Sequence, residues 1–119
     1  YPPNQPTPKR CYDLGRALKR GIESWHAGAR VAVLASGGLS HVVIDEELDQ
    51  RVIRALKSKD ADALASLPRE LLNSGNSEIR NWIATAAAVE EMDMELLDYV
   101  PCYRSPASTG YAMAFAYWD

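Results

Sequence analysis

Two titratable side chains follow segments that interrupt regular structure, and both could carry chemistry. His41 comes three residues after Gly37-Gly38, which ends the apolar run Val31–Ala35. Glu78 follows the loop 74–77, at the start of a predicted helix. Histidine takes up and releases a proton near neutral pH, and a carboxylate is a common ligand of hard metal ions. His41 is therefore a candidate acid/base group, and Glu78 a candidate metal ligand.

Each of these residues also has a simpler explanation. A loop histidine can be satisfied by local hydrogen bonds, and a glutamate in the first turn of a helix is favoured by the helix dipole. A capping box does not explain Glu78, because Gly75, three residues earlier, has no side chain to complete it. The pattern alone leaves both explanations open for both residues.

Four other residues are weaker candidates. His26 is expected to be a solvated cation at a helix C-terminus. Arg80 and Arg104 could bind the carboxylate of a ligand, although solvated or ion-paired arginines are more common. Trp82 is expected in the core rather than as a platform for a ligand.

The first third of the chain predicts one helix and one strand. Thr7 can cap a helix over residues 8–25 whose first position is Pro8. Its inner stripe would be the apolar residues at three- and four-residue steps, namely Cys11, Leu14, Leu18, Ile22 and Trp25. The Val-rich run 30–35 predicts a strand that is buried on both faces.

The remaining elements alternate between helices and strands. A helix is predicted to begin at residues 45–47, with Leu48, Val52 and Leu56 inward. A short helix over 60–67 and a longer one over 78–91 follow. Strands are predicted over 95–100, where Pro101 would end the strand, and over 111–118, where large residues alternate with alanines. Together these elements predict an α/β fold, with helices layered around a small mixed sheet.

Composition excludes several classes of protein. The chain has 119 residues, a net charge of −3 and no dense Lys/Arg patch, which argues against a nucleic-acid partner. No apolar run reaches the roughly 18 residues of a membrane span. The two cysteines, Cys11 and Cys102, make neither a disulfide framework nor a zinc-binding spacing, which favours a cytoplasmic location.

The opening of the chain is rich in proline. Residues 1–8 contain four prolines and no initiator methionine. Such a segment is extended and poor in local hydrogen bonds, so we expect an arm. It also suggests that the chain begins inside a longer protein.

Three segments, read in order, resemble a known family. VAVLASGGLSHVVIDEELDQ, SGNSEIRNWIATAAA and DYVPCYRSPASTGYAMAFAYW are similar to the C-terminal part of the class III extradiol ring-cleaving dioxygenases. These form the protocatechuate 4,5-dioxygenase catalytic-subunit family, which includes gallate-type enzymes. The resemblance covers nearly all of the chain, including the Pro-rich opening. It implies that residues 1–119 are the C-terminal portion of one catalytic domain.

The resemblance also implies a cofactor, a reaction and two residue roles. Members of the family hold a non-haem Fe(II) with two histidines and one glutamate, which leaves positions open for a catechol-type aromatic acid and O2. His41 matches the acid/base histidine, and Glu78 matches the iron ligand. The two iron-binding histidines of the family lie in an N-terminal half that these residues do not include. The fragment alone is therefore expected to be inactive unless another chain supplies the missing half. Because the family is commonly multimeric, a homo-oligomer or association with another chain is also expected.

Two other functions remain open at this stage. Relatives with the same fold that have lost the iron ligands act as binding or scaffold proteins. A different metal-dependent hydrolytic site could also occupy a similar scaffold. The residues upstream of Tyr1 would separate the enzyme from the binding protein.

Overall fold

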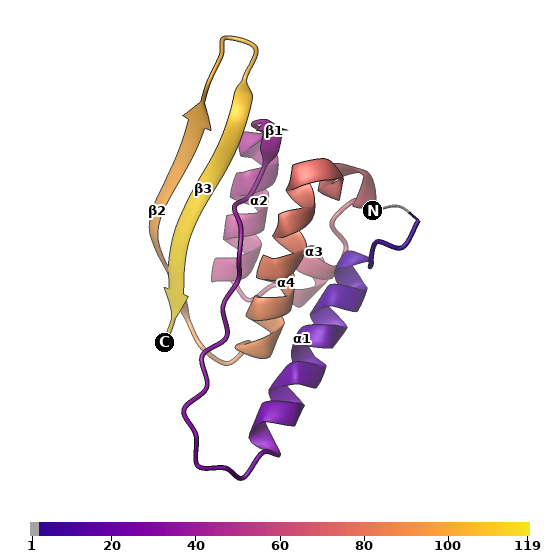
Figure 1. Cartoon of the computed structure of the whole chain (residues 1–119), viewed down its shortest axis with the longest axis vertical. Helices are drawn as coiled ribbons and strands as arrows, with labels where there is room; N and C mark the ends of the chain where they lie inside the picture. Colours follow the sequence, from indigo (N-terminus) through magenta and orange to yellow (C-terminus); the bar gives the residue numbers. More distant parts are fainter. Residues whose placement is uncertain (1–2) are drawn as a thin grey trace.

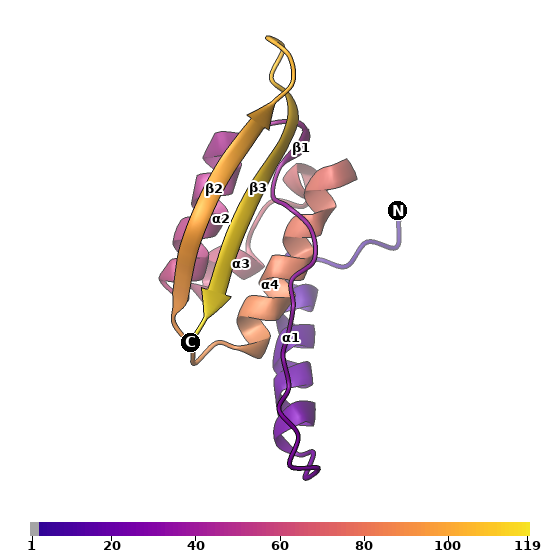
Figure 2. The same cartoon turned by 60° about the vertical axis from the view of Figure 1, so that its left-hand side comes forward.

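The computed structural model describes residues 3–119 and has all its helices on one side of a small sheet (Figures 1 and 2). The predicted α/β class is confirmed, but the described sheet is antiparallel rather than mixed. The helices are α1 (Pro8–Glu23), α2 (Glu46–Lys57), α3 (Ala61–Ala65) and α4 (Ile79–Ala88), with the 3-10 turns η1 (Arg69–Leu72) and η2 (Ser74–Glu78). The strands are β1 (His41–Val43), β2 (Met94–Tyr103) and β3 (Thr109–Trp118).

The sheet has the order β1-β3-β2, and every strand pair described is antiparallel. The hairpin of β2 and β3 makes most of it, and β1 pairs only with the first residues of β3. This register places His41 opposite Tyr111. The alanines of β3 face the helices, as the alternation predicts, and Ala112 is fully buried. The larger residues that alternate with these alanines, namely Tyr111, Phe115 and Tyr117, are exposed, whereas Trp118 packs against the core beside Trp82.

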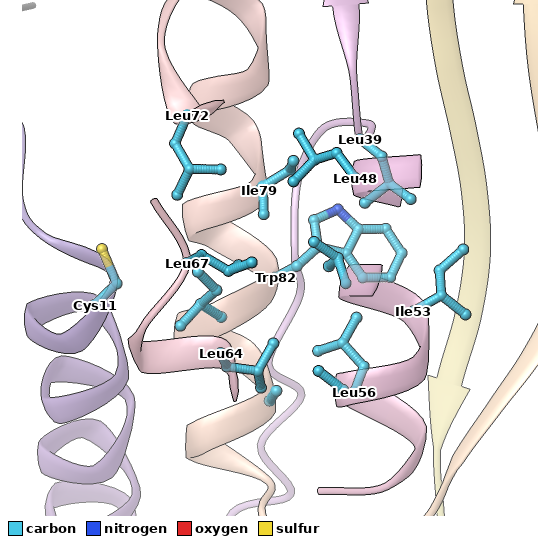
Figure 3. Packing of buried hydrophobic residues seen from close by; sticks show 14 of the residues in the cluster. Cys11, Leu39, Leu48, Ile53, Leu56, Leu64, Leu67, Leu72, Ile79 and Trp82 are labelled. Atoms are coloured by element: carbon cyan, nitrogen blue, oxygen red, sulfur yellow. The ribbon is translucent and has the colours of Figure 1, made fainter. Parts of the chain in front are cut away.

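The core lies between the alanine face of β3 and the inner faces of α2, α3 and α4. Leu48, Val52 and Leu56 of α2 are buried, as their spacing predicts. Trp82 packs at the centre, among Leu39, Leu48 and Ile79 (Figure 3), and its predicted place in the core is confirmed. Most of α4 is buried, because it lies between the sheet and α1 (Figure 1).

The predicted strand over residues 30–35 is wrong. This segment has no regular secondary structure, and Leu34 is 85% exposed. A strand buried on both faces needs hydrogen-bonded neighbours, yet among residues 3–119 no backbone hydrogen bond engages this segment. It instead runs as an extended connection from α1 to β1 (Figures 1 and 2).

The predicted inner stripe of α1 is also wrong in part. Cys11 is buried, but Leu14 and Leu18 are exposed. The buried face is instead formed by Pro8, Cys11, Tyr12 and Gly15. The physical reason is the close approach of α4 at Gly15, which turns the leucines outward.

Pro101 does not end β2, contrary to the prediction. It lies inside the strand, opposite Ala112, and the strand continues to Tyr103. β2 is the edge strand of the sheet, and an edge strand tolerates a residue without an N–H group. A bulge between Leu96 and Asp98 interrupts the same strand.

The Pro-rich arm is described from residue 3 onward, and residues 1–2 lie outside the described part. The arm is held by two arginines, since Arg80 donates from Nε to the carbonyl of Pro6 (2.8 Å) and Arg69 donates to the carbonyl of Gln5 (3.5 Å). Thr7 caps α1, as predicted, by accepting a hydrogen bond from the backbone N–H of Arg10.

Candidate active site

The two side chains selected from the sequence meet in the folded chain. Glu78 Oε2 lies 3.2 Å from His41 Nε2, although the residues are far apart in sequence. The same oxygen accepts a 2.8 Å hydrogen bond from the backbone N–H of Gly38. Glu78 is the last residue of η2, directly before α4. His41 follows Gly37 and Gly38 in the chain and is the first residue of β1.

The hydrogen bonds of the His41 ring define which nitrogen faces the site. Nδ1 lies 2.8 Å from the carbonyl oxygen of Leu39. A carbonyl only accepts, so we assign the Nδ1 proton to this bond. Nε2 then remains to exchange a proton on the side of Glu78. A protonated ring would form an ion pair with this carboxylate.

Further contacts hold the histidine in place. Its backbone N–H donates to Asn76 Oδ1 (2.6 Å), and its ring stacks on Tyr111 with centroids 5.3 Å apart and an interplanar angle of 16°. Gly75 lies directly against it, since a Cβ atom added there would be 2.2 Å from His41 Cβ. Asn76, Tyr111 and Gly75 thus surround His41 from η2 and β3.

Gly75→Ala should displace His41 from Tyr111. Two carbons cannot approach to 2.2 Å, so either His41 or η2 must move. We expect the nuclear Overhauser effects between the His41 and Tyr111 rings to weaken or disappear in the variant. Ser77→Ala, a change in the same turn, is the matched control and should leave them intact. Unchanged effects in a folded Gly75→Ala variant would contradict this packing.

Side chains on one face of α4 hold the backbone of residues 36–37 in place. Asn81 Nδ2 donates to the carbonyl of Ser36 (2.7 Å), and Trp82 Nε1 donates to that of Gly37 (3.1 Å). Together with Glu78, these side chains stand at positions i, i+3 and i+4, which share a helix face. Sequence reasoning missed Asn81 and the polar contact of Trp82. Their spacing from Glu78 was the available signal.

The pair opens into a cavity of about 690 Å³. His41, Glu78 and the two glycines form its polar end, and β3 supplies an apolar wall that includes Tyr111, Met113 and Phe115. Gly37 has φ +103° and lies against the Glu78 carboxylate, where a Cβ would fall 2.2 Å from Oε2. A concave, largely apolar site with a few convergent polar groups suits a small aromatic ligand.

The other candidates do not join this site. His26 is exposed in the loop after α1, and Arg104 is exposed near the β2–β3 turn. The sequence favoured a solvated or ion-paired Arg80, and this expectation is wrong. Arg80 is 7% exposed and donates to the carbonyls of Pro6 and Leu72 instead.

The residues present fit a metal ion only in part. Within residues 3–119 no group of three or more His, Cys, Asp or Glu side chains could hold a metal ion. Glu78 can contribute one carboxylate, because none of the hydrogen bonds described engages its Oε1 and its side chain is 41% exposed. A metal centre here needs ligands from beyond the described residues.

Comparisons with known proteins place this geometry in context. Residues 3–114 match the family model described as the catalytic LigB subunit of aromatic ring-opening dioxygenase. A gallate dioxygenase of Pseudomonas putida is 54% identical over 41 residues, which are 34% of this chain and 12% of that enzyme. The match therefore spans only a small part of the relative's length. Because the family model covers most of the residues, the chain belongs to the family of catalytic LigB subunits of aromatic ring-opening dioxygenases.

Proposed function

We propose that this chain carries the acid/base histidine and one metal ligand of an enzyme that opens a catechol-type aromatic acid with O2. The observation that carries the proposal is the 3.2 Å approach of His41 Nε2 to Glu78 Oε2 inside an open cavity. Family membership supports the reaction class, and the gallate dioxygenase relative supports a gallate- or protocatechuate-like substrate.

The proposed cofactor is Fe(II), with Glu78 as one ligand. Two histidines from outside these 119 residues would complete the ligand set, so the chain is the C-terminal portion of one catalytic domain in this proposal. Held by Glu78 and those two histidines, Fe(II) would supply the Lewis-acid and redox chemistry that extradiol ring opening with O2 requires. A carboxylate suits this hard ion, and Glu78 can offer Oε1 while Oε2 stays with Gly38.

His41 would handle protons in this reaction. Its Nδ1–H is engaged by Leu39, so Nε2 would take the proton of a substrate hydroxyl and later return it. Glu78 lies close enough to stabilise the positive charge on the ring while the proton is held there. The apolar side chains of β3 would contact the aromatic ring and exclude water from it.

The proposal includes association with further polypeptide, either a second copy or the segment that carries the two histidines. The incomplete ligand set supports it, because within residues 3–119 no group of three or more His, Cys, Asp or Glu side chains could hold a metal ion. Within residues 3–119, no helix is long and apolar enough to cross a membrane. The free thiols of Cys11 and Cys102 are compatible with the proposed cytoplasmic location.

The test is O2 consumption by the full-length protein that carries this sequence, reconstituted anaerobically with Fe(II). Protocatechuate, gallate and a panel of other catechols are added in turn, and ring opening is followed as a yellow product. We expect stoichiometric O2 uptake with at least one of them. If iron binds but no catechol is consumed, the enzyme proposal fails, and a binding or scaffold function takes its place.

A further inference from the structure

A buried carboxylate outside the proposed pair holds the segment that carries His41. Asp49 of α2 is fully buried, and among the described residues no Lys, Arg or His forms an ion pair with it. It accepts three hydrogen bonds instead. They come from the Ser40 backbone N–H (2.8 Å), the Ser40 hydroxyl (2.7 Å) and the Tyr99 hydroxyl (2.7 Å).

These bonds join three elements at the residue before His41. Ser40 is held through both its backbone and its side chain, and its Oγ also accepts a hydrogen bond from the Asp45 N–H (2.9 Å). Tyr99 reaches Asp49 from β2. On the opposite side, the His41 N–H is held by Asn76. The backbone at residues 40–41 is therefore restrained from α2 and from η2 at the same time.

Burial of the Asp49 carboxylate is energetically unfavourable. Burial raises the pKa of Asp49 above its ordinary value, and the hydrogen bonds from Ser40 and Tyr99 oppose that rise only in part. The pKa of Tyr99 is also raised, by burial and by the adjacent Asp49. An apolar side chain of similar volume would avoid the desolvation penalty, but it could not hold Ser40.

We propose that Asp49 is a positioning residue for His41, and that its bonds to Ser40 set the imidazole against Glu78 and Tyr111. The turnover part of this inference rests on the proposed function. The structural part does not, because it concerns only where the His41 ring lies.

Asp49→Asn tests the proposal, since it keeps the shape of the side chain but supplies one carbonyl oxygen where the carboxylate has two. Glu47→Gln is the control, because it removes the same charge from an exposed position on the same helix. At one constant pH, we expect nuclear Overhauser effects between the His41 and Tyr111 rings to be lost in Asp49→Asn and kept in Glu47→Gln. In the iron-loaded enzyme, kcat should fall about tenfold to a hundredfold in Asp49→Asn, with KM and iron content little changed.

Each outcome decides the proposal. Unchanged ring contacts and unchanged kcat in a folded Asp49→Asn variant overturn it. If Asp49→Asn does not fold, Ser40→Ala is judged by the same criteria, because it removes the hydroxyl that donates to Asp49 and so weakens the proposed link between Asp49 and His41. If the wild-type enzyme opens no catechol, the proposed function fails, while the contacts of the His41 ring still confirm or overturn the positioning role.

Discussion

Replacing Glu78 with glutamine should remove iron from the reconstituted enzyme, whereas replacing His41 with alanine should remove turnover and leave the iron in place. The glutamine is neutral and a weak ligand for Fe(II), yet its carbonyl can still accept the hydrogen bond from Gly38. The fold should therefore survive while the metal is lost. Loss of general acid/base catalysis at His41 should lower kcat by roughly 10²-fold or more.

The measurements are iron content after desalting and the rate of O2 uptake at saturating substrate. Glu70→Gln is the control for the loss of one negative charge, because Glu70 is exposed in η1 and lies outside the cavity. It should match the wild type in both measurements. The reverse pattern, with iron lost in His41→Ala and kept in Glu78→Gln, would show that the two roles are exchanged.

Periodicity predicted the elements whose partners lie within the chain. The spacing of Leu48, Val52 and Leu56 identified the inner face of α2, and the alternation in residues 111–118 identified β3 and its alanine face. These patterns succeed because burial against a neighbouring layer selects them directly. The core position of Trp82 was predictable for the same reason.

The failures occur where burial depends on something that a local pattern does not carry. The run 30–35 is Val-rich, but the described residues offer it no neighbouring strand. Leu14 and Leu18 have helical spacing, but a glycine rather than a leucine is needed where α1 meets α4. Apolar periodicity identifies an apolar face of a helix or strand, but it does not identify the element that packs against that face.

The sequence predicted the two candidate site residues but not the residues that hold them in place. A histidine after two glycines and a glutamate at a helix start were visible from the sequence, and the structure brings the two together. The roles of Asn76 and Asp49 could not be predicted, because a hydrogen bond to a backbone group distant in sequence produces no periodic sequence pattern. Such residues emerge only when the fold juxtaposes segments from different parts of the chain.

Gly15→Ala should destabilise the chain even though alanine is the better helix former. An added Cβ would lie 2.1 Å from the carbonyl oxygen of Ala84 and 2.7 Å from the Cβ of Ala87. The oxygen belongs to the backbone of α4 and cannot turn aside, so the two helices must separate. Overpacking of this kind costs about 1–3 kcal/mol, which exceeds the gain of up to about 1 kcal/mol in helix propensity.

Gly21 of the same helix is the matched control for this effect. Nothing lies within 4 Å of a Cβ added at Gly21, so Gly21→Ala should gain the propensity without a clash. Its free energy of unfolding should rise by about 0.5–1 kcal/mol, measured by urea denaturation under the conditions used for Gly15→Ala. If the free energy of unfolding falls in Gly15→Ala and rises in Gly21→Ala, the effect of packing is separated from that of helix propensity. If both variants instead raise the free energy of unfolding by the same amount, the close contact between α1 and α4 at Gly15 is contradicted. Only helix propensity would then distinguish glycine from alanine at either position.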